Sequence, residues 1–235
     1  MQKISELSVF FPAYNEEANI KSTVEKAREV LFWVAQKWEI IIVDDGSNDR
    51  TGEIAEDLAR KDSRIRVITH SPNRGYGAAL KSGFYGSRYG WIAFTDSDGQ
   101  FDFSEITNFI EKQRETNADL VIGYYKKRQV SLFKVVTSKA WELLVSILFG
   151  LKVKDIDCGF KLISRKVIEG IPKLESERGA FISSEFLIKA KKKGFKIVEI
   201  PVTHKPRKVG KGTGRNINVI IRSFIDLLTL WGKLR

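Results

Sequence analysis

The stretch WIAFTDSDGQF, residues 91–101, joins an apolar run to a cluster of polar residues. The apolar part, 91–95, predicts a buried strand, and Asp96 and Asp98 follow where that strand ends. Side chains two residues apart in an extended segment point to the same side, so both carboxylates can face one point beyond the strand. Mg²⁺ is usually held by one or two carboxylates together with substrate phosphates. The stretch therefore indicates a metal site for a nucleoside diphosphate, although an Asx-type turn would use the same residues.

Around this stretch, short apolar strands alternate with helical patterns. Strands are expected at 7–11, 40–43, 65–69, 91–95 and 119–122, and helices at 16–31, 51–60, 77–88 and 104–116. Buried β-branched runs separated by helices predict an α/β fold with a mostly parallel, doubly wound sheet. In such sheets ligands bind beyond the carboxyl ends of the strands. The polar stretches 12–16, 44–47 and 96–98 all fall at such ends, which favours one shared site over three unrelated turns.

Length and composition limit the classes of protein that fit. The chain has 235 residues, a formal net charge of +11 and one cysteine, Cys158. We expect one domain over 1–215, followed by an amphipathic helix over 216–235 that belongs to the same domain or lies on a membrane. A single cysteine cannot form an internal disulfide, which fits a reducing compartment. The first residues lack the pattern of a signal peptide.

The positive charge suits nucleic acid, an anionic membrane or a phosphate-rich substrate. A basic nucleic-acid-binding module stays a competing interpretation, but the strand-end carboxylates would repel a polyanion, so we expect no nucleic-acid partner. The Rossmann glycine pattern, the Walker A motif, and the G-x-S-x-G, CxxC and HExxH motifs are all missing. Their absence disfavours dehydrogenases, ATPases, serine hydrolases and zinc enzymes. We expect His70 and His204 to be surface or packing residues.

Two later segments have amphipathic character. Residues 131–153 are rich in apolar side chains but are too polar and too short to span a bilayer. Apolar residues recur at helical spacing near the C-terminus, namely Ile217, Ile220, Ile221, Phe224, Leu227, Leu228, Trp231 and Leu234. Such helices can pack on the sheet, pack in a homo-oligomer or lie on a membrane. Basic ends and tryptophans favour peripheral association with a membrane, which we expect at its cytoplasmic side.

Taken together, the motifs resemble the family 2 glycosyltransferases of the GT-A fold, the fold of nucleotide-diphospho-sugar transferases. The similarity is to the branch of dolichyl-phosphate mannose and glucose synthases. It covers FPAYNEE at 11–17, IIIVDDGSNDRT at 40–51, NRGYGAAL at 73–80, FTDSDGQFD at 94–102, DIDCGFKLISR at 155–165 and VEIPVTHKPRKVGKGTG at 198–214. The resemblance implies an inverting, metal-dependent transfer of a hexose from GDP-mannose or UDP-glucose to a polyprenyl phosphate. An inactive relative that serves as an interaction partner stays a further alternative.

The resemblance also implies roles for individual residues. The nucleotide site would comprise Pro12, Ala13, Tyr14, Glu16, Val43, Asp44, Asp45, Ser97 and Lys211. Asp96, Asp98 and Gln100 would hold Mg²⁺ or Mn²⁺, and Asp96, Asp98 and Arg207 would act in catalysis, with Arg207 and Lys211 in a loop over the phosphates. Simpler interpretations remain open, because Glu16 could be a first-turn helix residue and Asp44 and Asp45 could only cap a turn.

The resemblance also implies a binding site for the acceptor substrate. The acceptor phosphate would be bound by Lys126, Arg128, Lys134 and Ser138, although Lys134 stands where the family has an arginine. A lipid phosphate is already ionised near neutral pH and needs only cations that position it. A hydroxyl on a glycolipid or polysaccharide would instead need a carboxylate base. Asp157 and Glu185 are the candidates, although Glu185 could simply support the acceptor region or cap its helix.

Overall fold

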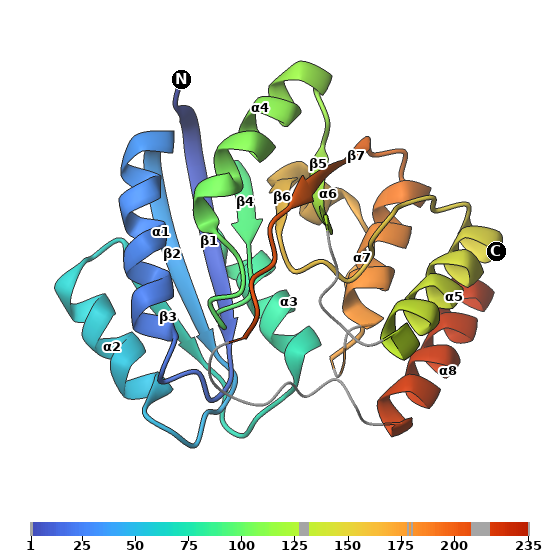
Figure 1. Ribbon diagram of the computed structural model, residues 1–235, viewed down its shortest axis with the longest axis horizontal. Helices are drawn as coiled ribbons and strands as arrows, with labels where there is room; N and C mark the ends of the chain where they lie inside the picture. Colours follow the sequence, from blue (N-terminus) through green and yellow to red (C-terminus); the bar gives the residue numbers. More distant parts are fainter. Residues whose placement is uncertain (1, 127–131, 178, 180, 208–216, 235) are drawn as a thin grey trace.

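A computed structural model of the chain describes residues 2–126, 132–177, 179, 181–207 and 217–234, with only the backbone at 132–136 and 217–222. The strands are β1 (Ile4–Ala13), β2 (Ala35–Asp44), β3 (Ile65–Thr69), β4 (Trp91–Phe94), β5 (Leu120–Tyr125), β6 (Lys161–Ser164) and β7 (Ile197–Val202). The helices are α1 (Ile20–Val34), α2 (Thr51–Lys61), α3 (Tyr76–Gly86), α4 (Ile106–Thr116), α5 (Leu132–Phe149), α6 (Arg165–Gly170), α7 (Phe181–Lys192) and α8 (Ile217–Leu234), with a 3-10 turn η1 (Phe103–Glu105). Figure 1 shows their arrangement around one central sheet.

The strands form a single mixed sheet in the order β3-β2-β1-β4-β6-β5-β7. The pairs β1–β2, β1–β4, β2–β3 and β5–β7 are parallel, whereas β6 runs antiparallel to both β4 and β5. The predicted mostly parallel sheet is therefore confirmed, and it has two further strands that were not expected, the reversed strand β6 and the parallel strand β7. Ala13 pairs with Asp44, and Phe10 pairs with Phe94. The register thus places the ends of β1, β2 and β4 at the same edge.

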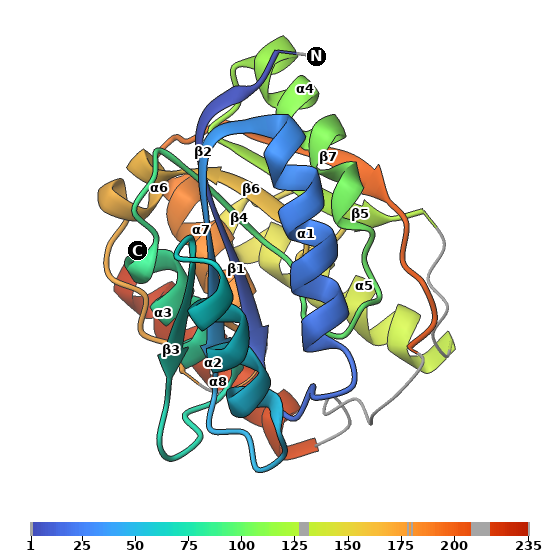
Figure 2. The same ribbon diagram turned by 90° about the vertical axis from the view of Figure 1, so that its left-hand side faces the viewer.

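Helices cover both faces of the sheet, as expected for a doubly wound fold (Figures 1 and 2). Residues of α1, α2 and α4 share one hydrophobic core with the sheet, and residues of α3, α5, α6, α7 and α8 share the other. Strand β1 shows why, because Val9 and Phe11 point into the first core and Phe10 into the second. In the second core the Phe10 ring lies 5.1 Å from the ring of Phe84. This alternation fixes the sheet between two helical layers.

The start of the first helix differs from expectation. The helix expected from Glu16 begins at Ile20 instead, because Asn15 adopts a positive φ of 55° and a turn follows it. The Glu16 carbonyl accepts hydrogen bonds from the amides of Asn19 and Ile20, each at 2.9 Å. Glu16 is therefore not a first-turn helix residue. The turn leaves it in the loop that follows β1, close to the strand ends.

Both amphipathic segments form helices, α5 and α8. On α8 the side chains of Leu227 and Leu230 are buried in the second core, while Phe224, Ile225 and Leu228 are exposed. The ring of Phe224 lies 5.2 Å from that of Trp141 on α5, so the two helices are neighbours. Within the described ranges, no helix combines the length and the apolar character needed to cross a bilayer.

Candidate active site

The loops that follow β1, β2 and β4 interlock at the carboxyl edge of the sheet. Ser97 Oγ donates a hydrogen bond of 2.7 Å to the Pro12 carbonyl, and the Asp45 amide donates one of 2.9 Å to the Ala13 carbonyl. The Ser97 carbonyl in turn accepts a hydrogen bond from Thr23 on α1 at 3.2 Å. The three polar stretches singled out in the sequence therefore meet in space.

Asp96 and Asp98 lie side by side in the loop after β4. Burial, and then the neighbouring Asp98 carboxylate, raise the pKa of Asp96 to about 6. Asp96 Oδ1 accepts a hydrogen bond from the Tyr76 hydroxyl at 3.1 Å. Asp98 Oδ1 accepts one from the Gln100 amide at 3.0 Å. Two neighbouring carboxylates repel one another, so this arrangement favours a bound cation.

Arg207 supplies a cation at this place. It follows β7, and its Nη2 donates to Glu16 Oε1 while its Nη1 lies 3.6 Å from Asp98 Oδ2. The guanidinium is thus shared between the loops after β1 and β4. All three side chains are largely buried, which strengthens ion pairs relative to those on the surface.

Gln100 holds the segment that carries Arg207. Its side-chain amide donates to the Lys205 carbonyl at 2.9 Å, and its own carbonyl accepts from the Lys205 amide at 2.8 Å. Phe101 and His204 form a β-bridge, and the His204 ring packs 5.3 Å from the Phe101 ring. His204 is therefore a packing residue, as expected. Gln100, predicted as a metal ligand, thus uses its side-chain nitrogen for the Lys205 backbone, whereas ligation of a metal would use its side-chain oxygen.

Asp45 is buried and its acceptor capacity is used within the protein. Its Oδ1 accepts from the Arg74 amide at 3.0 Å and lies 2.6 Å from His70 Nδ1. Its Oδ2 accepts from the Gly75 amide and from Asn73 Nδ2, each at 2.8 Å. A contact of this carboxylate with a nucleotide would require it to give up one of these donors. His70 is buried against Asp45, where it packs rather than facing solvent.

The neighbouring Asp44 caps a turn. Its Oδ1 accepts hydrogen bonds from both the amide and the hydroxyl of Ser47, at 3.1 and 2.5 Å. Ala13 and Val43 have fully or almost fully buried side chains, so a ligand could reach only their backbone. Tyr14 differs from these residues, because its ring is 39% exposed. An exposed aromatic ring at a strand end can stack on a planar ligand.

The structure describes part of the predicted acceptor region. Lys126 is exposed at the end of β5, and Ser138 is half-buried on α5. Arg128 and Lys211 lie outside the described residues, as does the side chain of Lys134. Asp157 is exposed in the loop before β6, and its amide donates to Asp155 Oδ1 at 3.1 Å.

Glu185, the other candidate base, is buried on α7. Its carboxylate accepts from the amides of Glu175 and Ser176 at 2.8 and 2.9 Å and from Lys189 Nζ at 2.6 Å. Both oxygens are therefore engaged by the segment before α7 and by Lys189. This geometry fits the alternative in which Glu185 supports neighbouring structure.

Three residues that sequence reasoning did not single out act on Asp96, two of them by contact and Lys161 by its charge. Tyr76 donates to it, and burial together with the charge of Asp96 raises the pKa of the Tyr76 phenol well above its ordinary value, so the hydroxyl keeps its proton. Gly159 packs so closely that a Cβ there would overlap the Asp96 carboxylate. Lys161 is 1% exposed and donates to the carbonyls of Ile156 and Cys158. Only Lys161 left a signal in the sequence, as a charge inside an apolar run.

The residues present fit a divalent metal that is completed by its substrate. Among the described residues, no group of three or more histidine, cysteine, aspartate or glutamate side chains could hold a metal. Asp96 and Asp98 supply two carboxylates, whose oxygens are hard ligands. Mg²⁺ accepts such a small number of protein ligands when phosphates fill its other positions. The guanidinium of Arg207 beside Asp98 is a stand-in for such a cation.

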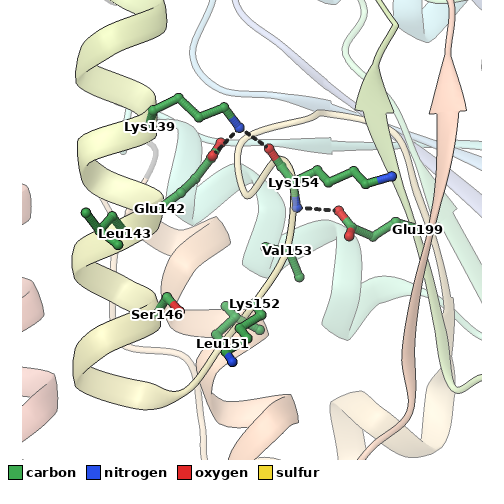
Figure 3. A pocket seen from close by; sticks show the side chains of 9 residues that line it. All are labelled: Lys139, Glu142, Leu143, Ser146, Leu151, Lys152, Val153, Lys154 and Glu199. Carbon is green, nitrogen blue, oxygen red and sulfur yellow. Dashed lines mark hydrogen bonds and ion pairs between the residues drawn. The ribbon is translucent and has the colours of Figure 1, made fainter.

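A separate surface pocket lies between α5, the segment after it and β7 (Figure 3). It is lined by Lys139, Glu142, Leu143, Ser146, Leu151, Lys152, Val153, Lys154 and Glu199. Lys139 Nζ bridges Glu142 Oε2 at 2.5 Å and the Lys154 carbonyl at 2.9 Å, and the Lys154 amide donates to Glu199 at 2.7 Å. None of the residues of the candidate site lines this pocket.

Comparison with known proteins identifies the class of this site. The family model "Glycosyl transferase family 2" matches residues 8–171. Glycosyltransferase AglD of Haloferax volcanii is 32% identical over 86% of this chain, which spans 33% of that protein. Dodecaprenyl-phosphate galacturonate synthase of Rhizobium johnstonii is 30% identical over 98% of this chain and 68% of its own length. Polyprenol monophosphomannose synthase of Mycolicibacterium smegmatis is 31% identical over 89% and 82%.

Solved structures agree on the fold. Glucosyl-3-phosphoglycerate synthase from Mycobacterium tuberculosis, crystallised with Mn²⁺, uridine diphosphate and glucosyl-3-phosphoglycerate, superposes with a TM-score of 0.72 at 20% identity. The match covers 97% of this chain and 80% of that one. At this identity the likeness establishes the fold alone. From the family model and the relatives, this chain belongs to glycosyltransferase family 2 and is an enzyme with the GT-A fold.

Proposed function

We propose that the enzyme transfers a hexose from GDP-mannose or UDP-glucose to a polyprenyl phosphate, with inversion at the sugar. Relatives named as polyprenyl-phosphate and dolichyl-phosphate sugar transferases support the acceptor class. The observation that carries the proposal is the meeting of Asp98, Glu16 and Arg207 at the carboxyl edge of the sheet. Carboxylates and a guanidinium at one point are what a metal-bound diphosphate requires.

Asp96 and Asp98, with Gln100, would hold Mg²⁺ or Mn²⁺, which would neutralise charge on the departing nucleoside diphosphate. Arg207 moves from Asp98 to the diphosphate when the donor binds, because its planar fork of N–H groups matches phosphate oxygens. Glu16 keeps this guanidinium within reach of the phosphates. Lys211, which lies outside the described residues, would add a second cation for the phosphates.

The loops after β1 and β2 would bind the rest of the nucleotide. The residues proposed for this role are Pro12, Ala13, Tyr14, Val43, Asp44, Asp45 and Ser97. The buried members contribute backbone groups and the shape of the site, whereas Tyr14 contributes its exposed ring. Backbone groups at the ends of parallel strands are the usual place for a nucleotide in such sheets.

The acceptor phosphate would be positioned by Lys126, Arg128, Lys134 and Ser138. A phosphate monoester carries a charge of about −1.5 to −2 at neutral pH and attacks without a general base. If the acceptor were a hydroxyl, the exposed Asp157 would be the better placed base, since both oxygens of Glu185 are engaged. Comparing a short polyprenyl phosphate with the matching polyprenol separates these cases.

We also propose that α5 and α8 rest on the cytoplasmic surface of a membrane. Leu143 and Ile147 on α5 and Phe224, Ile225 and Leu228 on α8 are 43–71% exposed. Exposed apolar side chains on adjacent amphipathic helices fit the boundary between headgroups and acyl chains. Sedimentation with anionic vesicles tests this, and binding that Leu143→Asp and Leu228→Asp do not weaken would contradict it.

A binding experiment tests the donor and metal roles. Titrating GDP-mannose and UDP-glucose with Mn²⁺ present should give saturable binding for the true donor and raise the thermal midpoint by mass action. Asp98→Asn should abolish metal-dependent binding, whereas Asp57→Asn, an exposed aspartate on α2, should leave it unchanged. Absence of binding by both donors, or full binding by the Asp98 variant, would reject the proposal.

A further inference from the structure

Asp96 has a single hydrogen-bond partner among the described residues. The Tyr76 hydroxyl donates to its Oδ1 at 3.1 Å, and Gly159 packs against the Oδ2 side. The carboxylate is thus held on one side by a hydrogen bond and on the other by a residue without a side chain. Contact with Gly159 blocks rotation of the Asp96 carboxylate toward that residue, and rotation away from Tyr76 would break the hydrogen bond.

Tyr76 is itself held in place by a separate set of contacts. It is the first residue of α3 and follows Gly75, whose φ of 101° is strained for any residue with a Cβ. This conformation turns the Gly75 amide toward Asp45 Oδ2 at 2.8 Å, beside the bond from the Arg74 amide. The start of α3 is therefore tied to the end of β2 by a buried carboxylate.

A second tie joins α3 to the end of β3. His70 Nε2 lies 2.8 Å from Ser82 Oγ on α3, while its Nδ1 lies 2.6 Å from Asp45. Asp45 therefore contacts the residues just before α3 directly and the middle of α3 through His70. With the helix held at two points, the Tyr76 hydroxyl has little freedom to move relative to Asp96.

We propose that Tyr76 is a positioning residue that orients the Asp96 carboxylate for a divalent cation. The inference rests on the proposed function, because it concerns the metal that Asp96 would bind. Carboxylates that ligate metals are commonly hydrogen-bonded by a neighbouring group, and loss of that group typically lowers metal affinity or activity about 10–100-fold. Tyr76 is the neighbouring group that donates such a hydrogen bond to Asp96.

Tyr76→Phe tests the role, because it removes only the hydroxyl and keeps the ring against the second core. Tyr85→Phe is a matched control on the same helix, where the hydroxyl accepts from the Leu174 amide at 3.1 Å instead. The dissociation constant of Mn²⁺ is measured by electron paramagnetic resonance with GDP or UDP present, and thermal unfolding is followed in parallel. This measurement needs no turnover.

Tyr76→Phe should raise the Mn²⁺ dissociation constant about tenfold or more, while Tyr85→Phe changes it less than about twofold and both variants fold. An equal constant for wild type and Tyr76→Phe would overturn the inference and leave the proposed function standing. The same holds if Tyr85→Phe weakened Mn²⁺ as much as Tyr76→Phe. A wild-type protein that bound no Mn²⁺ with either nucleotide would overturn both.

Discussion

Replacing Glu185 by glutamine should lower the thermal stability of the enzyme without removing its activity. Glu185 and Lys189 lie one turn apart on α7, and each side chain is only 2% exposed. Glutamine keeps the size of the side chain but leaves the Lys189 ammonium buried without its carboxylate. Removing one partner of a buried ion pair costs about 3–5 kcal/mol.

That cost is large beside the ~5–15 kcal/mol that stabilises a typical native protein. At roughly 2–4 °C per kcal/mol for a chain of this size, the thermal midpoint should fall by about 6–20 °C. Adding Lys189→Met removes the uncompensated charge, so the double variant should regain much of the loss. The difference between the double variant and the sum of the singles measures the coupling of the pair.

The dependence on pH has a defined sign. Burial alone would raise the pKa of Glu185, but hydrogen bonds from Lys189 and from the amides of Ser176 and Glu175 hold it below its ordinary value of 4.5. The folded state then binds fewer protons than the unfolded state between the two pKa values. The stabilisation is complete above the ordinary value and is lost as pH falls through the lower folded value.

Circular dichroism gives the midpoints, and transfer is assayed well below them. A catalytic base would contribute about 10²–10⁴-fold, whereas a supporting residue predicts turnover within roughly threefold of wild type. A Glu185→Gln variant that melts normally but turns over a hundredfold more slowly, by the scale for general bases, would refute this reasoning. Glu185 would then be the base for a hydroxyl acceptor.

Three further predictions follow from single contacts. Gly159→Ala places a methyl group against Asp96, so metal-dependent turnover should fall about tenfold or more while the midpoint changes little; unchanged turnover would contradict the close packing. Burial raises the pKa of Cys158 to about 12, so a thiol reagent at neutral pH should label it only after unfolding, and rapid labelling of native protein would be contrary evidence. Arg207→Lys keeps the charge but loses the planar fork, so the KM for the donor should rise about tenfold by steady-state kinetics, and an unchanged KM would count against a diphosphate contact.

Much of the fold follows from local pattern. The apolar run 40–43 and the helical spacing over 51–60 needed no partner to be recognised, and both elements formed. Strand β6 was not predicted, because its four residues include Lys161 and its pairing with β4 and β5 joins distant parts of the chain. The turn at Asn15 was missed for a related reason, since Glu16 fits a helix start by charge alone.

In the candidate site too, some features could be predicted from the sequence and others could not. Carboxylates at strand ends are visible in the sequence, because strand and polar cluster are adjacent along the chain. Their partners are not visible, since the Tyr76 hydroxyl that meets Asp96 comes from 20 residues earlier and Arg207 reaches Glu16 across 191 residues. Only the folded chain brings these residues together, so sequence patterns could name the acids, and the family resemblance could suggest their roles, but neither could name the contacts that hold each acid in place.

Hydrogen-bond satisfaction separates the strand-end acids into two kinds. Asp45 accepts from four donors of the protein, and a carboxylate that is both buried and fully engaged has little left to offer a ligand. Asp98 accepts one amide, and its other oxygen faces the Arg207 guanidinium at 3.6 Å, too long for a hydrogen bond. In the proposed mechanism, a metal cation, which has more charge and a smaller radius than guanidinium, would replace Arg207 there and leave it available for the diphosphate. Donor binding and metal binding would then be coupled through one arginine, so each should tighten the other by the same factor.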